Sequence, residues 1–329
     1  MILTTFYCDG KFANPFDEFD QRIVQSLLAD GRRGGKDLAA MVGLSEATVS
    51  RRCGLFESTG AFRLCGFVDP WQCGCEAVVI ARFGVRGSVH AAAEKIAAVE
   101  GVHRLSWTAQ SNGLDALLTL ARASDLHALL DTMCASCGAI EHRSSHTVLA
   151  MLQGHDTDVK PAPTPMALML RDSTRQRYTD LRLVKLLQSD FRMTFTSIAD
   201  RLSTSITLAG EHTKRIVNSG AIRTIGVYDH GSLGRPLTIN VHISFAKNPL
   251  QHAASLRSKL RCNLVFVTAD PEQVVAEVSV ENEAAAVAWV EKARHLGDVR
   301  SVRWDPLLTI YKQTYDWAVP GETPKTGEP

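Results

Sequence analysis

The feature that most constrains this chain is a repeat of its own sequence at a distance of 160 residues. The segment FDQRIVQSLLADGRR at 19–33 matches TDLRLVKLLQSDFRM at 179–193, so that Asp20 falls on Asp180. The same offset continues without a gap and later aligns Gly60 with Gly220. Such a period is domain-sized and far longer than that of solenoid repeats. We therefore expect two copies of one architecture.

The first part of each copy has the pattern of a helix-turn-helix. In copy one, apolar residues at helical spacing follow Asp20, which we expect to cap the first helix. A second short helix is expected at about 35–42 and a tight turn at Gly43. A third helix should then run from a cap at Ser45 to a C-terminal Gly60. Its expected apolar stripe consists of Val49, Cys53 and Phe56.

The second part of each copy alternates strand and helix patterns in the order βαββαβ, which is typical of a ferredoxin-like domain. In copy one the expected elements are strand 76–85, helix 88–99, strands 102–109 and 115–122, helix 125–136 and strand 139–152. In copy two they are strand 236–245, helix 250–260, strands 263–269 and 274–280, helix 283–296 and strand 299–311.

These patterns predict an α+β chain in which a winged or plain helix-turn-helix domain and a ferredoxin-like domain occur twice in tandem. A proline-containing stretch, QGHDTDVKPAPTP, marks the join. The expected division is 17–64 and 65–152 for copy one, a linker at 153–176, 177–224 and 225–314 for copy two, and a disordered tail at 315–329.

Composition limits the environment and partners of the chain. The formal net charge is only +1, so contact with nucleic acid would depend on local basic patches. The N-terminus lacks the pattern of a secretion signal, and no apolar run is long enough for a membrane span. We therefore expect a cytoplasmic protein that has no contact with membranes, carries reduced cysteines and needs no cofactor.

Four of the eight cysteines lie in pairs, Cys73-Gly-Cys75 and Cys134-x-x-Cys137, which together could supply four zinc thiolates. Neither pair recurs in copy two, where Leu233 and Arg235 stand at the positions of the first pair. Small buried thiols are therefore the favoured interpretation.

The combined pattern resembles the Lrp/AsnC, or feast/famine, family of transcriptional regulators. Copy one carries the family's Asp-led helix and its "lA…vglS…tV…R…L…G" motif, and the similarity covers about 19–152 and again 179–312. The motif residues are Asp20, Leu38, Ala39, Val42, Gly43, Leu44, Ser45, Thr48, Val49, Arg52, Gly60 and Gly66. The resemblance implies a tandem-fused regulator that binds double-stranded DNA.

In a helix-turn-helix the N-terminal part of the third helix enters the major groove. If Val49 and Phe56 face inward, Glu46, Ala47, Ser50 and Arg51 face outward, and the last two are the best candidates for base contacts. Phosphate contacts are expected from Ser45, Arg52, Arg32, Arg33 and Lys36. In copy two we expect contacts from Ser205, His212 and Lys214, although this copy departs from the motif at Leu208, Ala209, Gly210 and His212.

The family resemblance also implies an effector site between paired βαββαβ domains, near a Gly-x-x-Asp-like turn. Copy one matches this loosely in WTAQSNGLD at 107–115, whereas copy two has TADPEQ at 268–273. An amino-acid-like effector would thus meet copy one, at Thr108, Gln110, Asn112, Gly113 and Asp115. A plain β-turn explains the same letters, since Asn-Gly is a strong hairpin signal.

The resemblance further implies that such domains pair face to face, either within one chain or between two, and a homodimer or larger homo-oligomer is expected. Two other functions remain open. One is a sirohaem decarboxylase-like enzyme, although the central strands lack that group's histidine, tyrosine, arginine and aromatic pattern. The other is an effector-binding assembly protein that no longer binds DNA.

Overall fold

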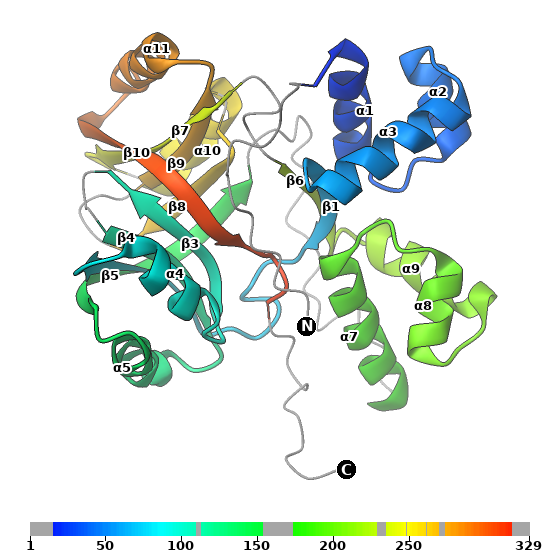
Figure 1. Ribbon diagram of the computed structural model, residues 1–329, viewed down its shortest axis with the longest axis horizontal. Helices are drawn as coiled ribbons and strands as arrows, with labels where there is room; N and C mark the ends of the chain where they lie inside the picture. Colours follow the sequence, from blue (N-terminus) through cyan, green and yellow to red (C-terminus); the bar gives the residue numbers. More distant parts are fainter. Residues whose placement is uncertain are drawn as a thin grey trace. The chain divides into compact units, whose positions relative to one another are not determined.

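The computed structural model of the chain describes residues 16–109, 113–153, 174–228, 235–247, 249–260, 262–269 and 274–317. They fold into two compact units, and each unit combines equivalent parts of both copies (Figure 1). The helix-turn-helix unit contains Asp17–Glu76, Lys160–Tyr228 and the segment from Thr314 onward. The barrel unit contains Ala77–Val159 and Asp229–Gln313. The expected domain boundaries place one copy after the other along the chain. Each folded unit instead contains residues of both copies.

In the described part of the helix-turn-helix unit, each copy contributes three helices and one strand. Copy one supplies α1 (Glu18–Ala29), α2 (Gly35–Val42), α3 (Glu46–Thr59) and β1 (Phe62–Phe67). Copy two supplies α7 (Thr174–Ser189), α8 (Phe195–Leu202), α9 (Ile206–Asn218) and β6 (Arg223–Tyr228). The expected turn and stop are confirmed, because Gly43 and Gly60 both adopt left-handed backbone with φ of 75° and 70°.

The expected cap of the first helix is wrong by one turn. Asp17 is the N-cap of α1 and accepts a hydrogen bond from the Asp20 amide, while the Asp20 carboxylate accepts one from the Asp17 amide. This reciprocal capping box explains why either aspartate could be taken for the cap. The counterpart Asp180 lies inside α7 and is fully buried.

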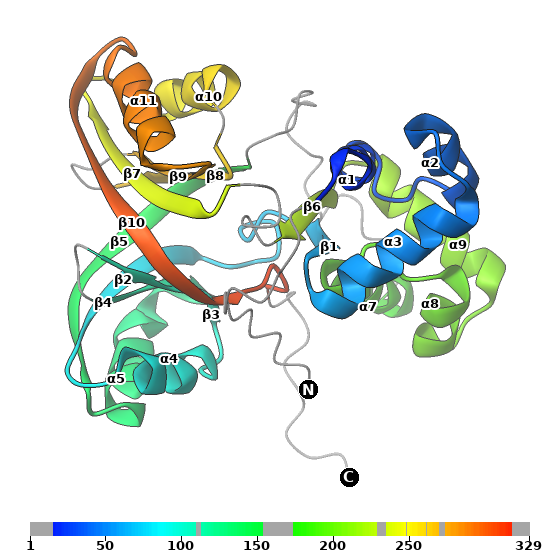
Figure 2. The same ribbon diagram turned by 45° about the horizontal axis from the view of Figure 1, so that its top comes forward.

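The strand that follows each helix-turn-helix pairs with its counterpart from the other copy, so the expected wing is instead a shared ribbon. β1 and β6 run antiparallel, and Cys65 lies opposite Ile225. These two positions are 160 residues apart, so the local two-fold axis passes through this pair. α1 contacts β6 and α7 contacts β1, so each copy packs its first helix on the other copy's strand (Figure 2).

The barrel unit contains two βαββαβ segments. The first consists of β2 (Ala77–Val85), α4 (Val89–Ala97), β3 (Val102–Thr108), β4 (Gly113–Leu120), the 3-10 turn η1 (Ala123–Asp125), α5 (Leu126–Ser136) and β5 (Ile140–Gln153). The second consists of β7 (Leu237–Phe245), α10 (Pro249–Lys259), β8 (Leu264–Thr268), β9 (Val274–Val280), α11 (Glu283–Arg294) and β10 (Val299–Gln313).

The strands join in the order β10-β3-β4-β2-β5-β8-β9-β7 into a closed barrel, so the two ferredoxin-like sheets pair within one chain. The long strands β5 and β10 make this pairing, since β5 pairs with both β2 and β8, and β10 with both β7 and β3. Closure leaves neither sheet with an open edge.

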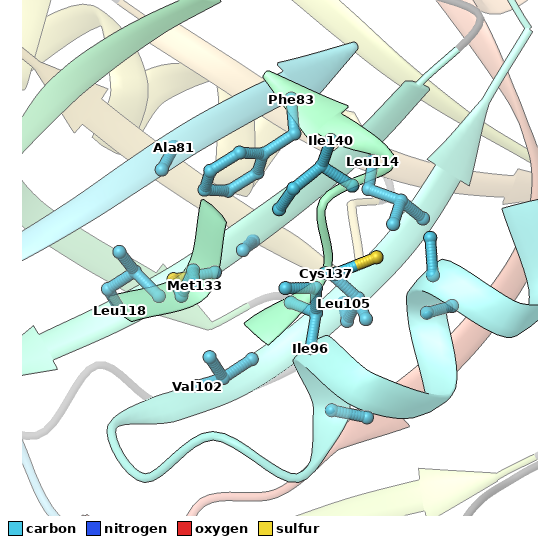
Figure 3. Close-up of a cluster of buried hydrophobic side chains, with 14 of the residues drawn as sticks. Ala81, Phe83, Ile96, Val102, Leu105, Leu114, Leu118, Met133, Cys137 and Ile140 are labelled. Carbon is cyan, nitrogen blue, oxygen red and sulfur yellow. The ribbon is translucent and has the colours of Figure 1, made fainter. Parts of the chain in front are cut away.

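Helices α4 and α5 cover the outside of the first sheet and bury an apolar core that includes Phe83, Ile96, Leu105, Leu114 and Met133 (Figure 3). The second sheet forms an equivalent core under α10 and α11. Each long strand also supplies side chains to the opposite core. The side chains on the outward face of each sheet thus form these cores, and the alternate side chains of each strand point to the inward face.

The expected disorder of 315–329 is wrong for its first part. Tyr315 and Trp317 are buried against Phe67, and the Trp317 indole N–H donates to the Val68 carbonyl oxygen at 2.6 Å. Aromatic burial therefore fixes this segment, which lacks the periodicity that sequence patterns detect. The remainder, 318–329, lies outside the described residues. Among the residues that are described, no helix combines the length and apolarity needed to cross a bilayer.

Candidate nucleic-acid interface and effector site

Helix α3 presents the face that the sequence predicts for base contact. The Ser45 hydroxyl caps the helix by accepting from the Thr48 amide at 3.2 Å. Val49 and Phe56 are buried, and Cys53 is half-buried, so the opposite side faces solvent. The exposed residues of the first two turns are Glu46, Ala47, Ser50 and Arg51. Arg51 is the arginine on this exposed face, and an arginine side chain can donate two parallel hydrogen bonds to guanine.

Arg52 does not belong to that face, and its expected role at phosphate is wrong. Its Nη1 atom lies 2.8 Å from an Asp17 carboxylate oxygen and 2.6 Å from one of Asp20. The hydrogen bonds that Arg52 donates to Asp20, which has the larger effect, and to Asp17 raise the pKa of Arg52. A guanidinium held by two carboxylates ties the start of α1 to α3 and has little charge left for DNA.

Arg32 likewise serves the fold rather than a phosphate. It donates from Nη1 to the Phe191 carbonyl oxygen at 2.6 Å and from Nη2 to that of Met193 at 2.9 Å. Its guanidinium also stacks over the Phe195 ring at 4.8 Å. Burial and the nearby charge of Arg192 lower the pKa of Arg32.

Arg192, the counterpart of Arg32, makes the same contacts in the opposite direction. Its Nη1 atom donates to the carbonyl oxygens of Gly31 at 3.1 Å and Arg33 at 3.4 Å. Those two residues are themselves the counterparts of the acceptors used by Arg32. We call the four hydrogen bonds of Arg32 and Arg192 the arginine clasp. Together with the β1–β6 ribbon, the clasp holds the two helix-turn-helix copies as a symmetric pair.

The other predicted phosphate contacts in copy one differ in availability. Lys36 is exposed at the start of α2. Arg33 is half-buried, with its Nε 3.8 Å from an Asp30 carboxylate oxygen and its Nη1 against the Met41 sulfur. Lys36 is thus the better placed of the two.

In copy two, Ser205 caps α9 and Lys214 is exposed, but the expected DNA contact by His212 is wrong. His212 is only 4% exposed, with Nδ1 3.6 Å from the buried Asp180 carboxylate. Arg215 donates to the same carboxylate at 2.5 Å. This cluster replaces the Arg52 bridge of copy one, so the substitution preserves the packing of α9 against α7.

Three of the expected effector residues lie side by side on the inward face of the barrel. Thr108 on β3 pairs directly with Gly113 on β4, and Ser106 pairs with Asp115 two residues further along. Thr108 and Ser106 are both fully buried. A side chain at Gly113 would place its Cβ 2.0 Å from the Phe83 carbonyl oxygen, so close strand packing requires this glycine. Gln110 and Asn112 lie outside the described residues.

Charged side chains that the sequence reading missed surround Asp115 inside the barrel. Arg82 and His242, which are equivalent in the two copies, meet across the interior, with Nη2 and Nδ1 3.3 Å apart. The Asp115 carboxylate lies 3.9 Å from Arg82 Nε. Burial raises the pKa of Asp115, against the opposing effects of Arg82 and His242.

A second cross-barrel contact joins Arg104 of β3 to Glu277 of β9, and both residues are almost fully buried. Asp305 of β10 is buried as well. Three atoms of these residues make no hydrogen bond, namely the Ser106 hydroxyl, the Arg104 Nε and the Oδ1 of Asp115. The sequence does contain a sign of these buried charges. In the otherwise apolar strand VVAEVSV, Glu277 occupies a position whose side chain points into the barrel.

The cysteine pairs contribute no metal centre within the described part of the chain, where His, Cys, Asp and Glu side chains nowhere gather in threes with suitable geometry. Cys73, Cys75 and Cys137 are buried, and Cys134 is half-buried. Burial raises the pKa of the Cys73 thiol, so it stays protonated.

Comparison with known proteins places this geometry among helix-turn-helix proteins. Residues 16–53 match the AsnC-type helix-turn-helix domain. The chain is 28% identical over 116 residues to an uncharacterized HTH-type transcriptional regulator of Pyrococcus furiosus, covering 35% of this chain and 78% of that protein.

Two solved structures illustrate the range of similar folds. The siroheme decarboxylase NirDL, solved with an iron-uroporphyrin III analogue, is 11% identical, with a TM-score of 0.57 over 90% of this chain and 93% of its own. The leucine response regulatory protein LrpA of Mycobacterium tuberculosis is 24% identical, with a TM-score of 0.37 over 41% of this chain and 93% of its own. The first likeness shows that the whole two-copy fold occurs in another single chain.

Proposed function

We propose that the chain, whose residues 16–53 match the AsnC-type helix-turn-helix domain, is a sequence-specific, DNA-binding transcriptional regulator of the Lrp/AsnC type. The observation that carries the proposal is the solvent face of α3. The helix is capped, packed on its inner side, and exposes Ser50 and Arg51 at the end that a helix-turn-helix inserts into the major groove.

Within copy one the structure supports a division of roles. Arg51 contacts guanine and Ser50 an adjacent base edge, while Glu46 and Ala47 line the same face. Lys36 contacts the phosphate backbone, and the exposed Ser45 hydroxyl lies at the same end of α3. Arg32 and Arg52 contribute indirectly, because one holds the two copies together and the other fixes α3 against α1.

Because the two helix-turn-helix copies pair symmetrically, one chain of the regulator carries two recognition helices, α3 and α9. A homodimer would present two identical recognition helices, whereas here Arg51 is replaced by Glu211. We therefore propose an operator with two unequal half-sites. Assembly into a homodimer or larger oligomer stays a prediction, since both the ribbon and the barrel already pair within the chain.

An amino-acid-like effector would bind on the inward face of the barrel, next to Thr108, Gly113 and Asp115. Support comes from the Ser106 hydroxyl and the Asp115 Oδ1, which make no hydrogen bond and could hold an ammonium or amide N–H, and from the buried Arg104 on the same strand as Ser106. Because a buried polar atom without a partner costs free energy, a ligand that satisfies both would gain affinity there.

A salt-dependent gel shift with the DNA upstream of the gene tests the regulator. We expect specific binding whose affinity falls steeply as salt rises, because cationic side chains displace counterions from phosphates. Candidate amino acids should shift the affinity, and an Asp115→Asn variant should lose that shift while still binding DNA. Absence of binding at low salt, with and without amino acids, would overturn the proposal.

A second candidate function is a sirohaem decarboxylase-like enzyme, which the whole-chain fold likeness to NirDL favours. The groups inside the barrel favour it less, since three carboxylates (Asp115, Glu277 and Asp305) outnumber the two guanidinium groups (Arg82 and Arg104), and the His242 imidazole lies beside Arg82. An anionic tetrapyrrole would need the opposite balance. Incubation with sirohaem, followed by mass spectrometry for loss of carbon dioxide, decides between the two.

A further inference from the structure

Helix α9, the counterpart of α3, exposes apolar side chains at the end where a recognition helix meets DNA. Ile206 is 54% exposed and Leu208 is 40% exposed, and Thr207 between them also faces solvent. The corresponding residues of α3 are Glu46, Ala47 and Thr48. Two large apolar side chains in the first turn of a surface helix suggest a binding face.

Helix α9 is capped and its inner side is packed, so the exposure of these apolar side chains does not result from a loss of helical structure. The Ser205 hydroxyl accepts from the Leu208 amide at 3.2 Å, as Ser45 does in copy one. Ala209, Thr213 and Ile216 are buried. Gly210 lies against Phe195, whose ring would be 3.5 Å from an added Cβ. The core positions of α9 are thus maintained while its solvent face has changed.

The charge of copy two indicates which kind of partner this face meets. Residues 17–61 contain six basic and seven acidic residues, whereas the equivalent residues 177–221 contain seven basic and four acidic ones. Around the recognition helix, copy two gains charge where Met41 becomes Arg201 and Gly54 becomes Lys214, and loses acidic groups where Asp37 becomes Ser197 and Glu46 becomes Ile206. It also loses basic groups where Lys36 becomes Thr196, Arg51 becomes Glu211 and Arg52 becomes His212, so the excess of basic residues belongs to the module as a whole. Copy two is therefore the more basic module, and its charge complements a polyanion.

Apolar side chains on a basic recognition helix have a specific target in the major groove, where thymine alone presents a methyl group. We propose that α9 is a second DNA reader in which Ile206 and Leu208 contact thymine C5-methyl groups, while Arg201 and Lys214 contact phosphates. Glu211, which replaces Arg51, faces the amino donor of a cytosine. This inference rests on the proposed DNA-binding function and extends it to the copy that departs from the family motif.

The operator should then have chemically different halves, with guanine recognised by α3 and thymine by α9. The test begins by selecting the preferred duplex from random sequence with the full-length protein. Each thymine is next replaced by deoxyuridine, which removes only the methyl group. We expect affinity to fall about fourfold for each contacted methyl, as burial of one such group predicts.

Protein variants assign that loss to α9. In Leu208→Ala, replacing the contacted thymine by deoxyuridine should no longer lower the affinity, because the methyl group has lost its protein partner. Adding Arg51→Ala to this variant should still weaken binding, because Arg51 contacts the other half-site. Leu250→Ala is the matched control, since Leu250 is 55% exposed on the barrel unit and should leave DNA affinity unchanged.

The outcomes separate this inference from the proposed function. If the wild-type protein selects no duplex, the proposed function falls, and this inference with it. If DNA is bound and Arg51→Ala weakens binding, but deoxyuridine and Leu208→Ala have no effect, only the inference is overturned. A Leu208→Ala variant that binds DNA normally but changes the molar mass by light scattering would show that the face joins two copies of the chain, which also overturns it.

Discussion

Replacing Arg32 by alanine should loosen the pairing of the two helix-turn-helix copies. The change removes hydrogen bonds of 2.6 and 2.9 Å to two carbonyl oxygens and the stacking on Phe195. A hydrogen bond from a charged donor contributes about 1.5–3 kcal/mol, and we take the lower part of that range because Arg32 is only partly buried. The expected loss is about 3 kcal/mol. Arg192→Ala should cost less, since its hydrogen bonds are 3.1 and 3.4 Å long.

Hydrogen exchange measured by mass spectrometry on peptides covering β1 and β6 gives the direct readout. A loss of about 3 kcal/mol in opening free energy corresponds to exchange roughly 150-fold faster. Arg22→Ala is the control, because the Arg22–Glu18 pair is exposed and such pairs contribute little. The reasoning is refuted if Arg32→Ala leaves exchange unchanged but lowers the salt dependence of DNA binding by about one counterion, as loss of a phosphate contact would.

Three further predictions concern stability. Arg104→Ala should destabilise the barrel unit by about 3–5 kcal/mol in urea unfolding, because Glu277 is left as an unpaired buried charge; the double variant Arg104→Met with Glu277→Leu should recover most of that loss. Burial raises the pKa of Asp115, so the folded state binds its proton more tightly, and stability falls as pH rises through that pKa. Asp115→Asn should therefore gain stability over wild type as pH rises above about 4, and a constant difference across pH would contradict this. Trp317→Ala should cost about 3–5 kcal/mol by thermal unfolding, whereas Leu250→Ala, at a side chain that is 55% exposed, should cost much less.

Local patterns in the sequence were sufficient to predict most elements of both copies. The strand expected at 274–280 is found as Val274–Val280, and the cap at Ser45 and the stop at Gly60 are both present. Such features depend on residues close together in the chain, which is why periodicity and capping rules find them. The 160-residue offset likewise predicted the duplication.

Contacts between distant residues account for what the sequence did not reveal. Arg32 and Arg52 have the positions of phosphate ligands in a helix-turn-helix motif. Arg32 instead binds the backbone of Phe191 in copy two, and Arg52 binds Asp20 of α1. The short strand β1 was missed because its partner strand is β6, more than 150 residues later. Inside the barrel, Arg82 and His242 meet only because the two sheets close on each other.

We propose that the solvent face of α3 reads DNA, whereas Arg52 on its inner side supports the fold. The most direct test is fluorescence anisotropy of the selected operator with the wild-type protein, Arg51→Ala and Arg52→Ala, together with urea unfolding of each variant. We predict that Arg51→Ala loses 1–3 kcal/mol of specific binding, about a 5- to 150-fold change, with unaltered stability. Arg52→Ala should instead lose stability, with its binding loss following the unfolded fraction. Equal DNA affinity of wild type and a fully folded Arg51→Ala variant would contradict the account.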